Sequence, residues 1–338
     1  MKFSVGYQLR SDDSLIKTIK DYSDKISEIY FSFEDIPNGR NTVSLGMNRY
    51  EARKKQEKDL KELAKESFAY NLLLNGNCYG KASQSREFFM KIGETVDYLS
   101  GEYDLKSVTT TSMLIAKFLK QNFNDIEVRA SVNIGADGAL GMDYIADLFD
   151  SFYLKREYNR DIGKLSSARK WCDNHGKKLY GLANSGCLNF CSAHTFHDNL
   201  VAHEAEISAM DNAYAFEGQC HLYLESSEKR KYWLRISNFI RPEDIRVYED
   251  YFDGMKLATR TNSNPSRVIC AYCRGSFSGA VTDLLEPNHS GHFYPEIIEN
   301  KKISDSFAKT VLSCNKDREN CNYCLDTQAA ETVTLPEL

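Results

Sequence analysis

Short apolar runs alternate along this chain with longer amphipathic or charged stretches. The apolar runs are rich in β-branched and aromatic residues and are bounded by polar turns, which is typical of strands buried on both faces of a sheet. Seven such runs are at residues 2–8, 26–33, 69–75, 105–110, 126–132, 148–154 and 178–183. An eighth strand is expected either at 232–236 or at 255–259.

The stretches between these runs predict helices at residues 47–68, 86–99, 112–122, 141–147 and 163–175. Seven or eight strands that alternate with helices favour a closed parallel (β/α)8 barrel of the TIM type, with some distortion allowed, over an open doubly wound sheet. No phosphate-binding P-loop and no GxGxxG follows a strand. We expect the barrel to occupy residues 1–286, and residues 287–338 to form an irregular, cysteine-bearing C-terminal extension.

Composition and charge narrow the class of protein. A chain of 338 residues, 42% apolar, can bury a large core. With 43 basic and 48 acidic residues, its net charge of −5 does not favour nucleic acid or an anionic membrane as a partner. No apolar run approaches the roughly 20 residues of a membrane helix, and no signal-peptide pattern opens the chain. We therefore expect a cytoplasmic protein.

Ten cysteines are the most informative chemical feature. In a large cytoplasmic protein they should be reduced, so a disulfide framework is not expected. Isolated cysteines are usually inert core residues, but close pairs indicate metal binding. Cys187 and Cys191 form a CxxxC pair, and there are two CxxC pairs, Cys270/Cys273 and Cys321/Cys324. Cys314 shortly precedes the last pair, and three cysteines stand alone, namely Cys78, Cys172 and Cys220.

Two cysteine-bearing loops directly follow predicted strands. Cys187 and Cys191 come after the strand at 178–183, and Cys78 comes after the strand at 69–75. The C-terminal ends of all strands meet at one mouth of a parallel barrel, which is where active sites of such barrels lie. The barrel assignment therefore predicts that these cysteines converge there.

Three passages resemble the family of U32 peptidase-like proteins. They are LLLNGNCYG, LANSGCLNFCSAHTFHDN, and FIRPEDIRVYEDYFDGMKLATRT followed by AYCRGSFSGAVTDLLE. The resemblance implies a β/α barrel. Several members of the family are [4Fe–4S] proteins that hydroxylate a quinone precursor or an RNA base without molecular oxygen, taking the oxygen from prephenate. An older description as collagenase-like peptidases is also attached to the family.

The resemblance implies roles for individual residues. Cys187 and Cys191 match the paired cluster cysteines, Cys78 matches an early ligand, and Cys220 is the candidate for the fourth. The better-known members have longer spacings between their cysteines, which leaves the third and fourth ligands open. His197 and Asn199 match the FHxN pattern, where the histidine would donate a proton or contact the substrate. The alternative is a histidine that only caps a loop.

The remaining clustered cysteines could form a second metal site. On spacing alone, two CxxC pairs suit a second cluster or a zinc ion. Alternatively, the C-terminal cysteines complete the first cluster or stay free. The candidates for this second site are Cys270, Cys273, Cys314, Cys321 and Cys324.

Basic residues near predicted strand ends are candidates for holding a small anionic co-substrate, which by resemblance would be prephenate-like. Ordinary solvated surface charge is the alternative explanation. The candidates are Arg156, Arg160, Arg241, Lys256 and Arg260.

Three functions remain open from the sequence. An iron–sulfur enzyme that performs an oxygen-independent hydroxylation or a related modification, best studied under anaerobic conditions, is favoured. A peptidase is the second, although no serine nucleophile elbow and no HExxH is present. A non-catalytic subunit, stabilised by an iron–sulfur cluster or zinc and bound to a homologous protein, is the third.

Overall fold

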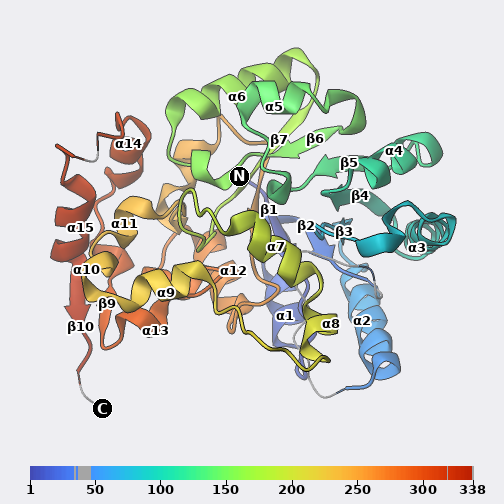
Figure 1. The fold of residues 1–338 in the computed structure, drawn as a ribbon, viewed down its shortest axis with the longest axis horizontal. Coiled ribbons are helices and arrows are strands. Elements are labelled where there is room, and N and C mark those ends of the chain that lie inside the picture. Colours follow the sequence, from blue (N-terminus) through green and yellow to red (C-terminus); the bar gives the residue numbers. More distant parts are fainter. Residues whose placement is uncertain (34–35, 37–46, 318, 337–338) are drawn as a thin grey trace.

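A computed structural model of the chain describes residues 1–33, 36, 47–317 and 319–336. It contains a closed barrel of eight parallel strands that follow one another in chain order, and β8 closes the barrel on β1 (Figure 1). The strands are β1 (Phe3–Gly6), β2 (Ile26–Phe31), β3 (Ala69–Leu74), β4 (Leu105–Thr110), β5 (Glu127–Ala130), β6 (Ser151–Tyr153), β7 (Lys178–Leu182) and β8 (Gly254–Leu257). The predicted (β/α)8 barrel is confirmed.

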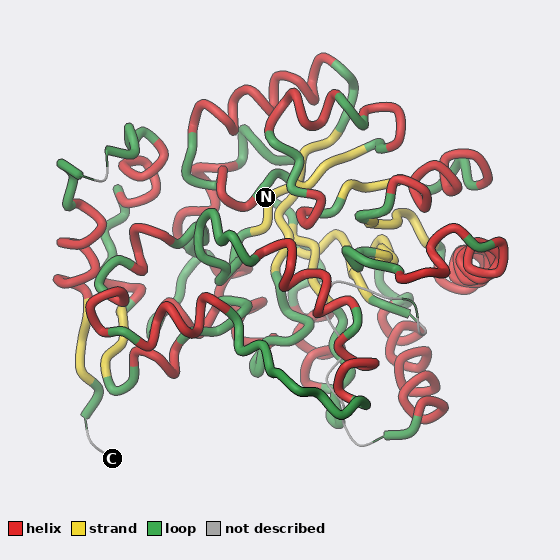
Figure 2. The backbone as a smooth tube through the Cα atoms, viewed as in Figure 1, coloured by secondary structure: helices red, strands yellow, loops and turns green. Residues whose placement is uncertain are grey.

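Helices cover the outside of the barrel (Figure 2). Their apolar faces pack on the strands; α1, for example, buries Leu15, Ile16 and Ile19. Helix α2 begins with a capping box, in which the Asn48 side chain accepts from the Glu51 amide at 3.0 Å and the Glu51 carboxylate accepts from the Asn48 amide at 3.2 Å. The outer helices are α1 (Ser14–Asp21), α2 (Arg49–Leu63), α3 (Arg86–Tyr103), α4 (Met113–Asn122), α5 (Gly138–Asp143), α6 (Ile162–Asn174) and α12 (Pro265–Arg274).

A buried polar layer fills the barrel near the N-terminal ends of its strands. Glu28 on β2 forms an ion pair with Arg129 on β5 at 2.9 Å, and Arg129 also pairs with Glu127 at 2.8 Å. Asn71 and Ser107 donate to the Glu28 carboxylate. The layer therefore ties four strands together by charged hydrogen bonds.

The connection between β7 and β8 is a long helical insertion. It contains α7 (His194–Ala202), α8 (Glu204–Ser208), α9 (Gln219–Glu225), α10 (Ser227–Arg230) and α11 (Trp233–Ile236). Residues 233–236 are therefore helical, and the eighth strand is the alternative that begins near residue 255. None of the described helices is long and apolar enough to span a membrane.

The insertion and the C-terminal extension share a second hydrophobic core. Trp233 of the insertion stacks on Phe239 with ring centroids 5.4 Å apart and meets Phe293 of the extension edge-on at 5.5 Å. The extension predicted to be irregular is thus a folded part of a side lobe (Figure 1). Its elements are α13 (Ser290–Phe293), β9 (Glu296–Ile298), α14 (Phe307–Leu312), α15 (Tyr323–Glu331) and β10 (Thr332–Thr334), with β9 and β10 antiparallel.

Candidate metal centre

A pocket over the C-terminal mouth of the barrel is rich in metal-ligating side chains. It is formed by the loop after β7, by α7 and α9, and by the segment before α13. Its polar lining consists of Cys187, Cys191, His194, His197, Asp198, Gln219 and Cys220. Three thiols, two imidazoles and a carboxylate from three segments therefore face one space.

Asn184 sets the direction of the loop that carries Cys187. Its buried side chain donates to the carbonyls of Ala258 and Leu284, both at 2.8 Å, and accepts from the Ala258 amide at 2.6 Å. The end of β7 is thereby fixed to the end of β8 and to the chain after α12. The sequence alone does not reveal these contacts, because all the partners of Asn184 are distant along the chain.

Gly186 allows the loop to run against the segment that begins the extension. Its amide donates to the Glu286 carbonyl at 2.9 Å, and a Cβ at this position would lie 2.0 Å from the Pro287 carbonyl oxygen. Only a residue without a Cβ fits such an approach.

Arg156 contacts the sulfur of Cys187. It is 5% exposed. Its Nη1 donates to the Cys187 Sγ at 3.0 Å and its Nη2 donates to the Asn133 side chain at 2.6 Å. The positive guanidinium beside this sulfur suits the negative charge that a metal-bound thiolate carries. Arg156, which was predicted to bind an anionic co-substrate, therefore contacts a cysteine sulfur in this structure.

Cys220 completes the set of thiols in the pocket. Burial, followed by the charges of Cys187 and Cys191, raises the pKa of Cys220 to about 11. Cys187 and Cys191 are therefore near enough to the Cys220 sulfur to act on it electrostatically.

The histidines of α7 occupy the same pocket. His194 Nε2 lies 3.2 Å from Asp198 Oδ2, and burial and then the Arg156 charge lower the pKa of His194. His197 lines the pocket and packs against the Phe216 ring at 5.2 Å. Asn199, which the family pattern paired with His197, is exposed and does not line the pocket.

Cys78 is near the mouth but outside this pocket. Its thiol is hydrogen-bonded to His203, and this contact and the Gly80 amide lower the pKa of Cys78. The Asn77 side chain meets Asp198 at 3.5 Å, so the loop after β3 reaches α7. The structure thus brings together Cys187, Cys191 and Cys220, and pairs Cys78 with a histidine.

Arg160 and Arg241, predicted to bind an anionic co-substrate, have their guanidinium groups hydrogen-bonded to other parts of the protein. The Arg160 guanidinium donates to the carbonyls of Leu234 and Phe239 at 2.7 and 3.2 Å. Arg241 is 1% exposed and binds the Asp244 carboxylate through two nitrogens at 2.7 and 2.8 Å. Its remaining donors bind carbonyls of the extension, which are those of Asn300, Ile303 and Ser304.

Lys256 and Arg260 are the two predicted anion-binding residues that belong to β8 and the residues just after it. The Lys256 Nζ lies 4.0 Å from the Tyr30 ring centroid and 5.3 Å from that of Tyr153. These rings come from β2 and β6, which are not neighbours of β8, so the side chain points into the barrel interior. Burial and then the Arg260 charge lower the pKa of Lys256 to about 7.

The cysteines considered for a second metal site are divided between two regions. Cys314, Cys321 and Cys324 line a cavity of the side lobe together with Arg160 and Lys316. Cys270 and Cys273 lie on α12, where Cys270 is hydrogen-bonded to Tyr22. The five residues therefore do not form one site.

The donor set of the mouth pocket fits an iron–sulfur cluster in its chemistry. Thiolates are the usual ligands of such clusters. Within the described residues, no three of the pocket's ligand atoms lie within 4.8 Å of one another. This spacing does not suit one zinc ion, but in a cluster each cysteine binds a different iron, so the sulfurs lie further apart.

Comparisons with known proteins give one relative and one structural neighbour of note. No family model matches the chain. A protein of Methanocaldococcus jannaschii described as an uncharacterized protease is 27% identical over 305 residues, which cover 88% of this chain and 86% of the relative. The solved structure of the U32 peptidase Mk0906 matches with a TM-score of 0.55 at 14% identity, over 76% of this chain and 91% of that chain.

Proposed function

The chain is a U32 peptidase-like protein, and we propose that it is an iron–sulfur enzyme of the oxygen-independent hydroxylase kind. The observation that carries the proposal is the convergence of Cys187, Cys191 and Cys220 with two histidines at the barrel mouth. These three cysteines would hold a [4Fe–4S] cluster. When bound, such a cluster supplies an electron or a Lewis-acidic iron.

The protein's own groups would have distinct tasks. Arg156 would hold the Cys187 sulfur and, through Asn133, keep the loops after β5 and β6 against it. His197, on the pocket wall, is the proposed proton donor or acceptor for the substrate. Among the residues predicted to bind an anionic, prephenate-like co-substrate, Lys256 is the one we propose for that role, because its Nζ points into the interior of the barrel.

The test is anaerobic reconstitution with iron and sulfide, followed by quantification of both. We expect ~4 iron per chain and a broad absorption band around 400 nm, as is usual for a [4Fe–4S] site. Both should be lost in Cys187→Ala, Cys191→Ala and Cys220→Ala. Cys270→Ala, a partly buried cysteine on α12, is the matched control and should keep its iron. Full iron in all three pocket variants would reject the assignment.

Peptidase activity is a second candidate, favoured by the description of the archaeal relative as a protease. Purified protein that cleaves peptides equally well before and after removal of iron would support a peptidase. Peptide cleavage that is absent in both states would leave the iron–sulfur proposal as the sole candidate of the two.

A further inference from the structure

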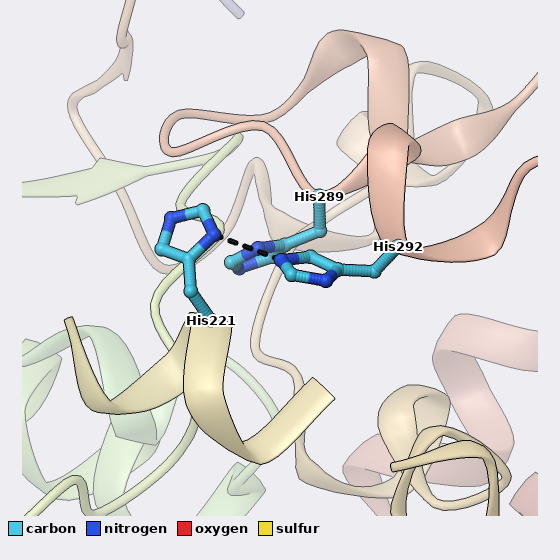
Figure 3. A group of neighbouring side chains, drawn as sticks. All are labelled: His221, His289 and His292. Atoms are coloured by element: carbon cyan, nitrogen blue, oxygen red, sulfur yellow. Dashed lines mark hydrogen bonds between the residues drawn. The ribbon is translucent and has the colours of Figure 1, made fainter. Parts of the chain in front are cut away.

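Three histidines from two separate segments face one another next to the cysteine pocket (Figure 3). His221 lies on α9, His289 immediately precedes α13, and His292 lies on α13. One ring nitrogen of each is within 4.8 Å of the other two. Across the described parts of the chain, no other trio of histidine, cysteine or acidic side chains meets this spacing.

The surroundings of His289 leave one of its nitrogens ready for a ligand. The side chain is fully buried, and its Nε2 lies 2.8 Å from the Gly186 carbonyl oxygen. A carbonyl only accepts, so Nε2 carries the proton and Nδ1 has a free lone pair. This Nδ1 is buried and has no hydrogen-bond partner among the described residues.

A buried polar atom that lacks a hydrogen-bond partner destabilises the fold. A metal ion at Nδ1 would relieve that cost. Metal-bound histidines commonly donate their other nitrogen to a backbone carbonyl, which fixes the tautomer and the ring orientation. The Gly186 carbonyl holds His289 in that arrangement.

The other two histidines supply the remaining donors. His221 Nδ1 and His292 Nε2 are hydrogen-bonded to each other at 2.9 Å, so one of the two carries a proton, which a change of tautomer would move away when a metal ion binds. Zn–N bonds of about 2.0–2.1 Å in a tetrahedral site place nitrogens about 3.3 Å apart. The His221–His292 pair is thus slightly closer than two ligands of one zinc ion, and a nitrogen of His289 lies within 4.8 Å of both.

We propose that His221, His289 and His292 form a binding site for a single divalent zinc-like ion. Imidazole suits zinc, and three histidines with an open fourth position are typical of zinc sites that bind water or a substrate. His221 and His292 are only partly buried, so the fourth position is reachable from solvent.

This site adjoins the cysteine pocket but shares no ligand with it. Gly186, whose carbonyl orients His289, precedes Cys187, and Cys220 precedes His221. A zinc ion would fix α9 against α13 and thereby brace two sides of the pocket. Since the two ligand sets are separate, each metal can be removed alone.

The experiment is an anaerobic titration of chelator-treated protein with Co²⁺ as a spectroscopic probe and with Zn²⁺ in competition with a chromophoric chelator. The absorption spectrum of cobalt-loaded His292→Ala is subtracted from that of the cobalt-loaded wild type. We expect this difference spectrum to show visible cobalt bands but no thiolate-to-cobalt charge-transfer band, because the ligands are histidines. Zinc affinity should fall at least about tenfold in His292→Ala and His221→Ala, because even the loss of groups outside the ligand shell costs that much. His175→Ala removes an exposed histidine at the C-terminal end of α6; this variant is the control and should bind zinc normally.

Two further measurements separate the site from the proposed cluster. Cys187→Ala should lose iron and keep the histidine-bound zinc, and His292→Ala should do the reverse. Should His292→Ala fail to fold by circular dichroism, His292→Gln replaces it. Equal zinc affinity in wild type and both histidine variants, or a difference spectrum dominated by thiolate bands, would overturn the inference.

Discussion

Replacement of Arg129 by methionine should destabilise the barrel strongly at neutral pH. Arg129 is 2% exposed and neutralises both Glu28 and Glu127, at 2.9 and 2.8 Å. Removing one partner of a buried ion pair costs about 3–5 kcal/mol, because the other charge stays buried. With an unfolding entropy of about 2.1 cal/mol/K per residue over 338 residues, the expected fall in Tm is about 4–7 °C.

The pH dependence of this loss follows from the two carboxylates. Burial alone would raise the pKa of Glu127, but the positive charges of Arg129 and Lys178 outweigh burial and lower this pKa to about 2. Burial acts in the same direction on Glu28, and there the charge of Arg129 is the main cause of the lowered pKa. A lowered folded-state pKa stabilises the fold above the unfolded value of about 4.5, and this contribution disappears as the pH falls toward 2. In Arg129→Met both carboxyls would protonate more readily, so the destabilisation should shrink below pH ~4.5.

The assay is thermal unfolding by circular dichroism between pH 3 and pH 8, on wild type, Arg129→Met, and Arg129→Met with Glu28→Gln. The double variant no longer buries the Glu28 charge, so it should recover part of the loss. A Tm within 1 °C of wild type, or a loss that stays constant across this pH range, would refute the reasoning.

Other predictions follow from single contacts. Arg156→Met removes the donor to the Cys187 sulfur and should weaken iron retention about 10–100-fold, measured as iron released to a chelator; unchanged release would contradict it. Gly186→Ala places a Cβ against the Pro287 carbonyl and should cost about 1–3 kcal/mol in urea unfolding, with loss of iron; a variant as stable as wild type would contradict the close approach. Arg241→Met should expose the C-terminal extension to limited proteolysis after residue 286, with no such cleavage in Arg246→Met.

The barrel was predictable because parallel strands carry a local signal, namely brief apolar runs separated by helical stretches. The run at 232–236 shows the limit of that signal. Its composition suits a strand, but Trp233 and Leu234 are buried in the second core, which forms only when the insertion meets the extension. Short apolar runs do not distinguish a strand from a buried helical turn.

For the candidate site, the sequence predicts where the paired cysteines lie but not which residues surround them. Cys187 and Cys191 follow a strand, so their place at the mouth could be inferred from the topology. The contacts of Arg160 and Arg241 could not be inferred from the sequence, because the carbonyls that they bind lie far along the chain. The histidine trio is likewise invisible in sequence, since 71 positions separate His221 from His292.

The most direct test of the central claim is a Mössbauer spectrum of protein reconstituted anaerobically with ⁵⁷Fe, compared with Cys187→Ala. We predict the signature of sulfide-bridged, cysteine-bound iron in the wild-type protein and its disappearance in the variant. A wild-type spectrum that contains only isolated ferrous iron, or one that is the same in both proteins, would contradict the account.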